Sequence, residues 1–325
     1  MDRRIQSATS RARNMPPKTK LRRGEALPAY KMQFVFITGG MGDFIHWTPA
    51  IRYAIDRHPH IHGYIVAPDY FVELARLWFG DLAPRFEVVD DVVPGFTSTI
   101  HAPGQLPNAM GYHLMDCGAM YFCNEPLPDA YRKMPRIHGD EIAVERFGLP
   151  ERYVVVVPGG MHPARTIAGQ TVNGLSDYLQ SRGFTPVYLG LERTAHYQKK
   201  TSFSPAVDWS KGLNLVNQTS TLEAACILAK AKAVVGIDGG LINLAFCSRV
   251  PVVAGMTVAS PKNRVPYRED GCRTEFVVPD LDCIFCQEKN RFLRNHHFED
   301  CLYDDYQCIN KLDTQAFVQK LETLL

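Results

Sequence analysis

The stretch VVGIDGGLINLAFCSRVPVV, residues 234–253, is the feature that most limits how this chain can fold. It predicts an apolar strand over residues 234–237, a turn at Asp238-Gly239-Gly240, a helix over 241–247 and a second strand over 251–254. Strands that alternate with helices in this way are typical of parallel sheets. The turn can also bind a phosphate, because glycine lets the backbone approach a ligand closely and the amides at a helix start favour an anion.

The same alternation recurs along the chain, which indicates an α/β protein with two tandem domains, as its 325 residues also suggest. The predicted strands cover residues 33–38, 64–67, 86–89, 112–116, 153–157, 186–189 and 214–216. The predicted helices cover residues 43–57, 70–79, 140–147, 173–182 and 220–230. Gly183 is predicted to end the helix over 173–182. Thr219 or Ser220 is predicted to cap the helix over 220–230, with Glu223 completing a capping box. Residues 91–107 are predicted to be a loop, and Gly148 to Glu151 to be the domain boundary. We therefore expect an arm over 1–30, an N-terminal domain over 31–150, a C-terminal domain over 151–312 and a final helix over 313–325.

The first 30 residues carry the excess of positive over negative charge in this chain. They hold eight Lys or Arg and two acidic residues, whereas the whole chain has a net charge of only +2. The segment has few apolar residues, so we expect it to be disordered. It can be read as a solubilising extension, as an arm that contacts DNA, or as one that contacts an anionic membrane. Its composition also fits a transit peptide, although no amphipathic helix is evident.

No apolar run in the sequence is long enough to span a bilayer, and no signal peptide is recognisable. The sequence therefore predicts a cytoplasmic protein, which the basic arm could hold at the inner face of the membrane.

A second glycine-rich turn lies near the start of the first predicted domain, in TGGMGDFIHWTPAI, residues 38–51. Its glycine spacing differs from that of the dinucleotide-binding fingerprint. Asp43 follows the predicted strand, where open α/β sheets usually hold their ligands. This carboxylate fits two roles equally well: the N-cap of the next helix, or a general base that takes a proton from a substrate hydroxyl.

These two turns together resemble glycosyltransferase family 9, the ADP-heptose heptosyltransferases. Residues 39–51 match the family's N-terminal signature at Gly42, Asp43, His46 and Pro49. Residues 214–254 resemble its second motif, with matches at Thr219, Ser220, Leu222, Glu223, Gly236, Asp238, Gly240, Leu244, Ala245 and Pro251. The resemblance implies a GT-B fold, in which two Rossmann-like domains face a cleft and the second domain holds a nucleoside-diphosphate sugar. It also implies transfer with inversion and no metal in the chemistry.

The resemblance assigns roles to residues of both domains. Asp43 would be the general base, beside an acceptor-side loop that includes Gly40, Gly42 and His46, although a lone histidine at this position is often structural. The donor would be held by the following residues of the second domain: Gly159, Gly160, Arg165, Glu192, Asp238, Gly239, Gly240 and Asn243. Arg165 would hold phosphate, or is a surface arginine. Glu192 would contact the ribose, or is an exposed residue at a helix start.

Two positions of the second motif differ from the family pattern. Gly239 stands where the family has threonine, and Asn243 where it has histidine. The phosphate-binding turn relies on backbone and is not affected, but the sequence does not identify the sugar.

Five of the nine cysteines lie in the last sixth of the chain. Within the cysteine-rich segment 282–308, Cys283 and Cys286 form a C-x2-C pair that Cys301 and Cys308 follow. Four such thiols can hold a structural Zn²⁺, or they are reduced or partly disulfide-paired. Four cysteines outside this region are predicted to be buried thiols of a protein in a reducing compartment: Cys117, Cys123, Cys226 and Cys247.

The sequence thus predicts an inverting glycosyltransferase that acts on a bacterial surface glycan. One alternative acceptor is a hydroxylated base in DNA. A sugar-nucleotide epimerase would need several acids and a histidine around the sugar, which we cannot place in this sequence. The remaining alternative is a sugar-nucleotide-binding module without catalysis.

Overall fold

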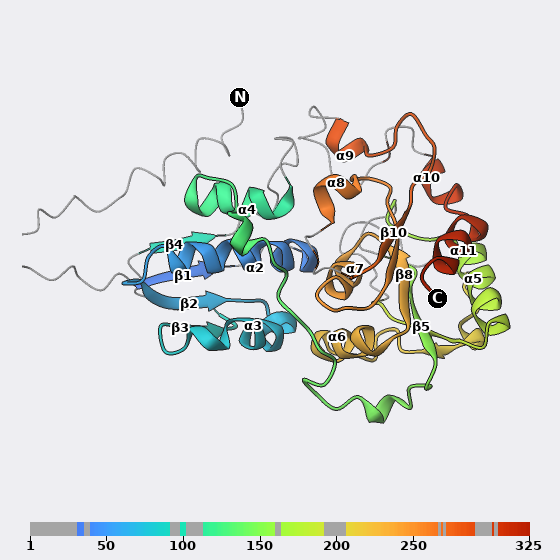
Figure 1. Cartoon of the computed structure of the whole chain (residues 1–325), viewed down its shortest axis with the longest axis horizontal. Coiled ribbons are helices and arrows are strands. Elements are labelled where there is room, and N and C mark those ends of the chain that lie inside the picture. Colours follow the sequence, from blue (N-terminus) through green and yellow to red (C-terminus); the bar gives the residue numbers. More distant parts are fainter. Residues whose placement is uncertain are drawn as a thin grey trace, which may run out of the picture.

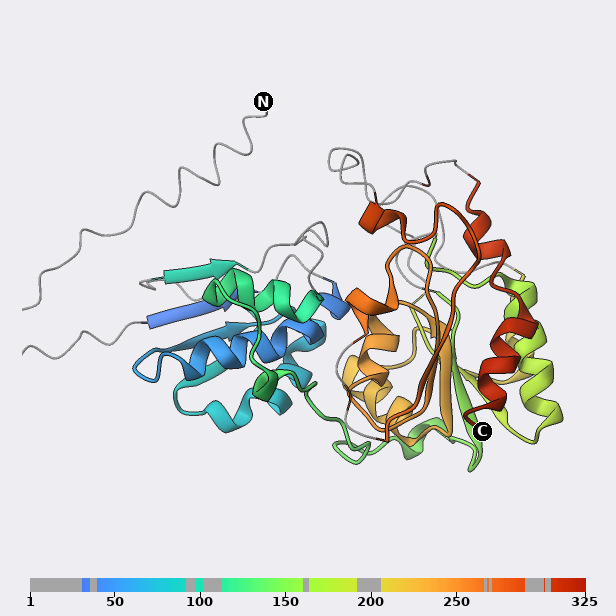
Figure 2. The same ribbon diagram turned by 45° about the horizontal axis from the view of Figure 1, so that its top comes forward.

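The computed structural model describes residues 31–35, 40–91, 98–101, 113–159, 164–191, 206–265, 268, 271–289, 301 and 305–325. These residues form two α/β domains that lie side by side, the first coloured blue to green and the second green to red (Figures 1 and 2). The predicted arm over 1–30 lies outside the described residues. Within the described part of the chain, no helix has the length and apolar character needed to cross a membrane.

The N-terminal domain contains a four-stranded parallel sheet in the order β3-β2-β1-β4. Its strands are β1 (Lys31–Val35), β2 (His62–Val66), β3 (Phe86–Val89) and β4 (Ser98–His101). Its α-helices are α2 (Met41–Asp56), α3 (Val72–Phe79) and α4 (Leu114–Cys123), with short 3-10 helices at Asp69–Phe71, Gly80–Leu82, Asp129–Tyr131 and Glu145–Phe147. Because β1 lies inside the sheet and precedes α2, the start of α2 lies near the carboxyl edge of the sheet.

The C-terminal domain contains a six-stranded parallel sheet in the order β10-β9-β8-β5-β6-β7. Its strands are β5 (Tyr153–Val157), β6 (Thr185–Tyr188), β7 (Leu213–Asn214), β8 (Ala233–Ile237), β9 (Val252–Gly255) and β10 (Thr274–Val277). This is the doubly wound order, which reverses between β5 and β8. Ligands of such sheets bind at this point. Gly159 lies just after β5 and Asp238 just after β8, the two strands that meet there.

Seven α-helices and one 3-10 helix, at Trp209–Lys211, are described in the C-terminal domain. The α-helices are α5 (Gly169–Ser181), α6 (Thr221–Lys230), α7 (Gly240–Ala245), α8 (Pro261–Arg264), α9 (Cys286–Lys289), α10 (Gln307–Asn310) and α11 (Thr314–Glu322). The final helix, α11, packs on α5, β9 and β10, on the side of this domain that faces away from the N-terminal domain (Figures 1 and 2).

Two predicted helix boundaries are confirmed, one by its capping bonds and the other by its backbone conformation. The Ser220 hydroxyl accepts from the Glu223 backbone N–H at 3.2 Å, and the Glu223 carboxylate accepts from the Ser220 N–H at 2.8 Å. Gly183 has φ +74° just after α5, where the left-handed conformation favours glycine.

Several predicted elements are wrong. The strand predicted over 112–116 is not found in its described residues, 113–116, because α4 begins at Leu114, where the His113 side chain accepts from the Met115 N–H. The predicted helix over 140–147 is only the 3-10 helix at 145–147, since the Glu141 carboxylate binds the backbone N–H groups of His138 and Gly139 instead. The predicted loop over 91–107 contains β4.

The two domains share one apolar core. The helix α2 packs against α7, and α3 packs against α6, so that each domain buries a helix face on the other. The largest cluster of buried side chains runs through both domains, from Phe44 and Trp47 of α2 to Ile242 and Leu244 of α7. The start of α2 is therefore held against the turn that precedes α7.

Candidate functional site

Asp43 lies in the first turn of α2, facing the C-terminal domain. The helix begins at Met41 with Gly40 as its N-cap, so Asp43 does not fill the N-cap role, which was one of the two alternatives for this residue. Its carboxylate instead accepts from the Gly40 backbone N–H at 3.1 Å. Burial raises the pKa of Asp43, against the opposing effects of Arg264, the Gly40 N–H and Arg165. A carboxylate with a raised pKa is better suited to general base catalysis near neutral pH.

Two arginines of the C-terminal domain approach this carboxylate. Arg264 ends α8, and Arg165 lies in the loop that follows β5. That loop returns to the strand end, because the Ile167 N–H donates to the Pro158 carbonyl at 2.7 Å and Gly159 pairs with Thr166. Both arginines lower the pKa of Asp43, so their positive charges act on a residue of the other domain.

Arg165 also faces Asp238, the residue after β8. Its Nη2 lies 3.8 Å from the Asp238 Oδ2, and both side chains are largely buried. Burial lowers the pKa of Arg165, and Asp238 opposes this effect. Within the described residues, Asp238 Oδ2 and Arg165 Nε are buried without a hydrogen-bond partner. A buried polar atom without a partner is unfavourable, so both atoms favour a ligand that supplies the missing bonds.

Asn243 connects the two domains. Its side-chain nitrogen donates to the Gly239 carbonyl at 2.9 Å, which leaves its oxygen to accept from His46 Nε2, also at 2.9 Å. His46 comes from α2 and is fully buried. The residue that departs from the family pattern at position 243 therefore pairs with a histidine of the other domain. Sequence reasoning missed this interdomain contact.

The burial of His46 makes it a source of pH dependence. Burial lowers the pKa of His46 to about 3, with a smaller effect in the same direction from His113. The unfolded chain therefore binds a proton at this residue below about pH 6.5, whereas the folded chain does not, so stability falls as the pH falls.

Lowering the pH from 7 to 5 is expected to reduce the free energy of unfolding by about 2 kcal/mol through His46 alone. Urea denaturation of the wild type and of His46→Gln at both pH values measures this term. The variant should lose about that much of the pH dependence, whereas His58→Gln, at an exposed position, should keep all of it. An equal pH dependence in His46→Gln and wild type would contradict the assignment.

Two glycines allow the domains to approach this closely. A Cβ at Gly42 would lie 2.8 Å from Asn243 Nδ2, and one at Gly240 would lie 2.8 Å from the Met41 Cβ. The sequence predicts a ligand-binding role for both residues. In the structure both also give room for the contact between α2 and the start of α7.

A second histidine joins the domains beside the first. His113 Nδ1 accepts from the Met115 N–H at 3.2 Å, so Nε2 carries the proton and donates to the Val265 carbonyl at 2.8 Å. This bond holds the end of α8, and with it Arg264, against the N-terminal domain. Sequence reasoning missed both His113 and Arg264, because neither lies in a periodic or motif-like segment.

The structure describes only some of the remaining residues that were predicted to bind the donor. Gly159 is half-buried at the end of β5. Gly239 is the N-cap of α7 in an extended conformation, with φ −177°. Gly160 and Glu192 lie outside the described residues. The structure thus brings together Asp43, Arg165, Asp238 and the Gly239-Gly240 turn, and adds Arg264.

The four clustered cysteines are half-buried thiols near one another. Burial and the neighbouring thiols of Cys286, Cys301 and Cys283 raise the pKa of Cys308 to about 11. All nine cysteines lie in the described residues and none is disulfide-bonded. Among the described residues no group of three His, Cys, Asp or Glu side chains is arranged to hold a metal ion.

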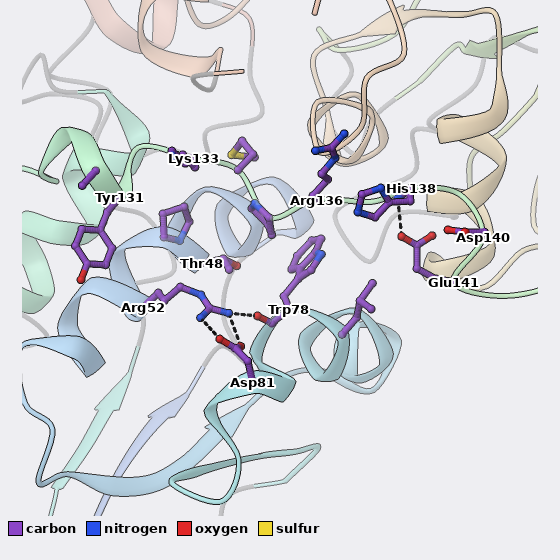
Figure 3. A pocket seen from close by; sticks show the side chains of 15 residues that line it. Thr48, Arg52, Trp78, Asp81, Tyr131, Lys133, Arg136, His138, Asp140 and Glu141 are labelled. Atoms are coloured by element: carbon purple, nitrogen blue, oxygen red, sulfur yellow. Dashed lines mark hydrogen bonds and ion pairs between the residues drawn. The ribbon is translucent and has the colours of Figure 1, made fainter. Parts of the chain in front are cut away.

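A cavity of about 670 Å³ lies on a different face of the N-terminal domain. It is lined by Thr48, Pro49 and Arg52 of α2, which the helical period places on the face opposite Asp43. Figure 3 shows Arg52 bound to Asp81 on one side of the cavity, with Arg136 and His138 on the other. This cavity is therefore separate from the candidate site.

Comparison with known proteins shows similarity only at the level of structure. No protein-family model matches the sequence, and no curated protein matches it. Among solved structures, the iron-containing dodecameric glycosyltransferase TibC from enterotoxigenic E. coli H10407 superimposes with a TM-score of 0.70 and 16% identity, over 92% of this chain and 78% of that chain. TibC has also been solved with ADP-D-β-D-heptose.

Two further solved structures superimpose on this chain. A family 9 glycosyltransferase from Veillonella parvula has a TM-score of 0.64 and 12% identity, over 93% of this chain and 99% of that chain. The E. coli heptosyltransferase WaaC with ADP has a TM-score of 0.54 and 14% identity, over 90% of this chain and 100% of that chain. At these identities the likeness shows the fold, so the predicted GT-B architecture is confirmed.

Proposed function

We propose that this chain is a glycosyltransferase that moves a sugar from a nucleoside-diphosphate sugar to an acceptor hydroxyl. The observation that carries the proposal is the meeting of Asp43, from one domain, with Arg165, Arg264 and Asp238, from the other. This cluster combines a carboxylate of raised pKa with two cations, the groups that such a transfer needs. The shared fold with heptosyltransferases, two of which were solved with ADP or ADP-heptose, supports this assignment.

In the proposed reaction, Asp43 takes the proton of the acceptor hydroxyl as its oxygen attacks the anomeric carbon. The bond from that carbon to the diphosphate breaks, and the nucleoside diphosphate leaves with the bonding electrons. Arg165 and Arg264 stabilise the negative charge that develops on the leaving group. A single displacement of this kind inverts the configuration at the anomeric carbon.

Asp238 would orient the sugar. Its buried Oδ2 can accept a hydrogen bond from a sugar hydroxyl, the kind of partner that the described residues do not supply. The Gly239-Gly240 turn would lie beside the diphosphate. Asn243 would act indirectly, because both ends of its amide are already bonded within the protein.

For the acceptor we propose a bacterial surface glycan, in a cytoplasmic enzyme. The proposal rests on the fold shared with heptosyltransferases. A DNA acceptor or a membrane contact would depend on residues 1–30, which lie outside the described part of the chain.

We also propose that Cys283, Cys286, Cys301 and Cys308 hold one metal ion with a structural role. Four thiols are a ligand set for Zn²⁺ or iron, and the similar enzyme TibC is iron-containing. Because burial and the neighbouring thiols raise the pKa of Cys286 and of Cys308, a cation at this site would be bound with release of protons. Elemental analysis of the purified protein should find one metal ion per chain, and none in Cys283→Ser; a metal-free wild type would contradict the proposal.

A thermal-shift screen tests the donor assignment. A ligand that binds only the folded state stabilises it and so raises the melting temperature. The free energy of unfolding increases by about 2.7 kcal/mol when the free ligand is present at 100 times its dissociation constant. At least one of ADP, GDP, UDP and CDP should shift the melting temperature, and the corresponding sugar conjugate should also do so. No shift with any of these nucleotides would contradict the proposed function.

A further inference from the structure

The loop that carries Arg165 and the start of α8 both contact α9, a short helix that the proposed chemistry does not use. The segment before α9 turns sharply at Phe285, which has φ +61°, a conformation that is unfavourable for a bulky residue. Such backbone persists where the surrounding structure fixes it. Here, the Phe285 side chain packs against the shared apolar core, and its N–H donates to the Thr257 carbonyl at 2.8 Å.

The backbone of α9 is fixed to the segment that follows β9. The Gln287 N–H donates to the Val258 carbonyl at 3.1 Å. Thr257, in turn, donates from its hydroxyl to the Ala164 carbonyl at 2.6 Å, so this segment also holds the residue next to Arg165. A continuous set of hydrogen bonds thus links α9 to the candidate site.

Two adjacent side chains of α9 form hydrogen bonds with two different segments of the candidate site. The Gln287 Oε1 accepts from Arg165 Nη2 at 3.2 Å. The Glu288 carboxylate accepts from the Ser260 N–H at 2.6 Å, at the N-cap of α8. One side chain therefore holds Arg165 directly, and the other fixes the start of the helix that ends in Arg264.

The chemical type of residue 287 matters for the charge of Arg165. A guanidinium has no acceptor atom, so it can bind Gln287 only through the amide oxygen, which is neutral. A glutamate at this position would form an ion pair and neutralise the arginine. With Gln287, Arg165 is oriented while its charge remains available, opposed only in part by Asp238 at 3.8 Å.

We propose that Gln287 and Glu288 are positioning residues that hold Arg165 and α8 for the diphosphate of the donor. The inference rests on the proposed function, since it assigns α9 a part in the same site. It predicts that the charge at residue 287, and not only its hydrogen bond, sets the affinity for a diphosphate.

Calorimetric binding of ADP, GDP, UDP and CDP tests this inference, with the nucleotide that binds most tightly as the probe and its nucleoside monophosphate for comparison. Gln287→Glu should weaken diphosphate binding by about tenfold to a hundredfold, and Gln287→Ala by about threefold to tenfold. Monophosphate binding should change less in both variants. Gln170→Glu adds the same charge at an exposed position of α5 and should bind like wild type.

Glu288→Ala tests the second side chain. It should raise the KM for the donor while the melting temperature, measured in parallel for every variant, shows that the protein stays folded. Equal diphosphate affinity in Gln287→Glu and Gln170→Glu, in folded proteins, would overturn the role of α9 and leave the proposed function intact. If wild-type protein bound none of the four diphosphates, the proposed function and this inference would both be overturned.

Discussion

Asp43→Asn is expected to reduce sugar transfer by about a hundredfold to ten-thousandfold, the usual contribution of a general base. Asparagine has nearly the same shape, and its side-chain oxygen can still accept from the Gly40 N–H, so the start of α2 should remain intact. It cannot take a proton from the acceptor. The loss should therefore appear in kcat, while the dissociation constant of the nucleoside diphosphate changes little.

Asp90→Asn provides the matched control, because Asp90 is an exposed carboxylate of the same domain. Its kcat should equal that of the wild type. If Asp43→Asn retained full transfer activity, Asp43 would lose its role as base. If it lost nucleotide binding to the same extent as transfer, the residue would serve the donor rather than the acceptor.

Arg264→Gln is expected to change both the pH profile and the donor affinity. Arg264 lowers the pKa of Asp43, although burial raises that pKa overall. Removing the cation therefore raises the pKa of Asp43 further. Because the base must be deprotonated, the acidic limb of the kcat/KM profile should move to higher pH. Donor affinity should fall by about tenfold through the loss of a cation beside the diphosphate.

The control for this variant is Lys262→Gln, which removes the same charge from an exposed position of the same short helix. Its profile should superimpose on that of the wild type. An acidic limb that stayed in place in Arg264→Gln, or that moved to lower pH, would show that Arg264 does not act on the base.

The elements that the sequence predicted correctly are those with local signals. Continuous apolar runs located β5 and β8, and the Ser220 and Glu223 pair located the start of α6. The helix α4 was misassigned because its residues are apolar on most sides. It buries one face against α2, where Gly118 lies so close to Trp47 that a Cβ would meet that ring at 3.0 Å. A helix buried in this way has no clear period in its sequence.

The sequence predicted the residues of the candidate site that follow a strand, but not the residues that the contact between the domains places there. Asp43 and Asp238 each follow a strand of a parallel sheet, a position that a single sequence reveals. The pairs His46 with Asn243 and His113 with Val265 are separated by 197 and 152 residues in the chain. Nothing local in the sequence indicates that these residues meet, and the position of Arg264 depends on the same contact.

If the two domains together form one site for a nucleoside-diphosphate sugar, a crystal structure with a bound nucleoside diphosphate will show it. The diphosphate should lie against the guanidinium groups of Arg165 and Arg264, beside the Gly239-Gly240 turn, with Asp43 facing the position of the transferred sugar. A nucleotide bound away from these residues, for example in the cavity beside Arg52 and Trp78, would show that the residues between the two domains do not form the donor site.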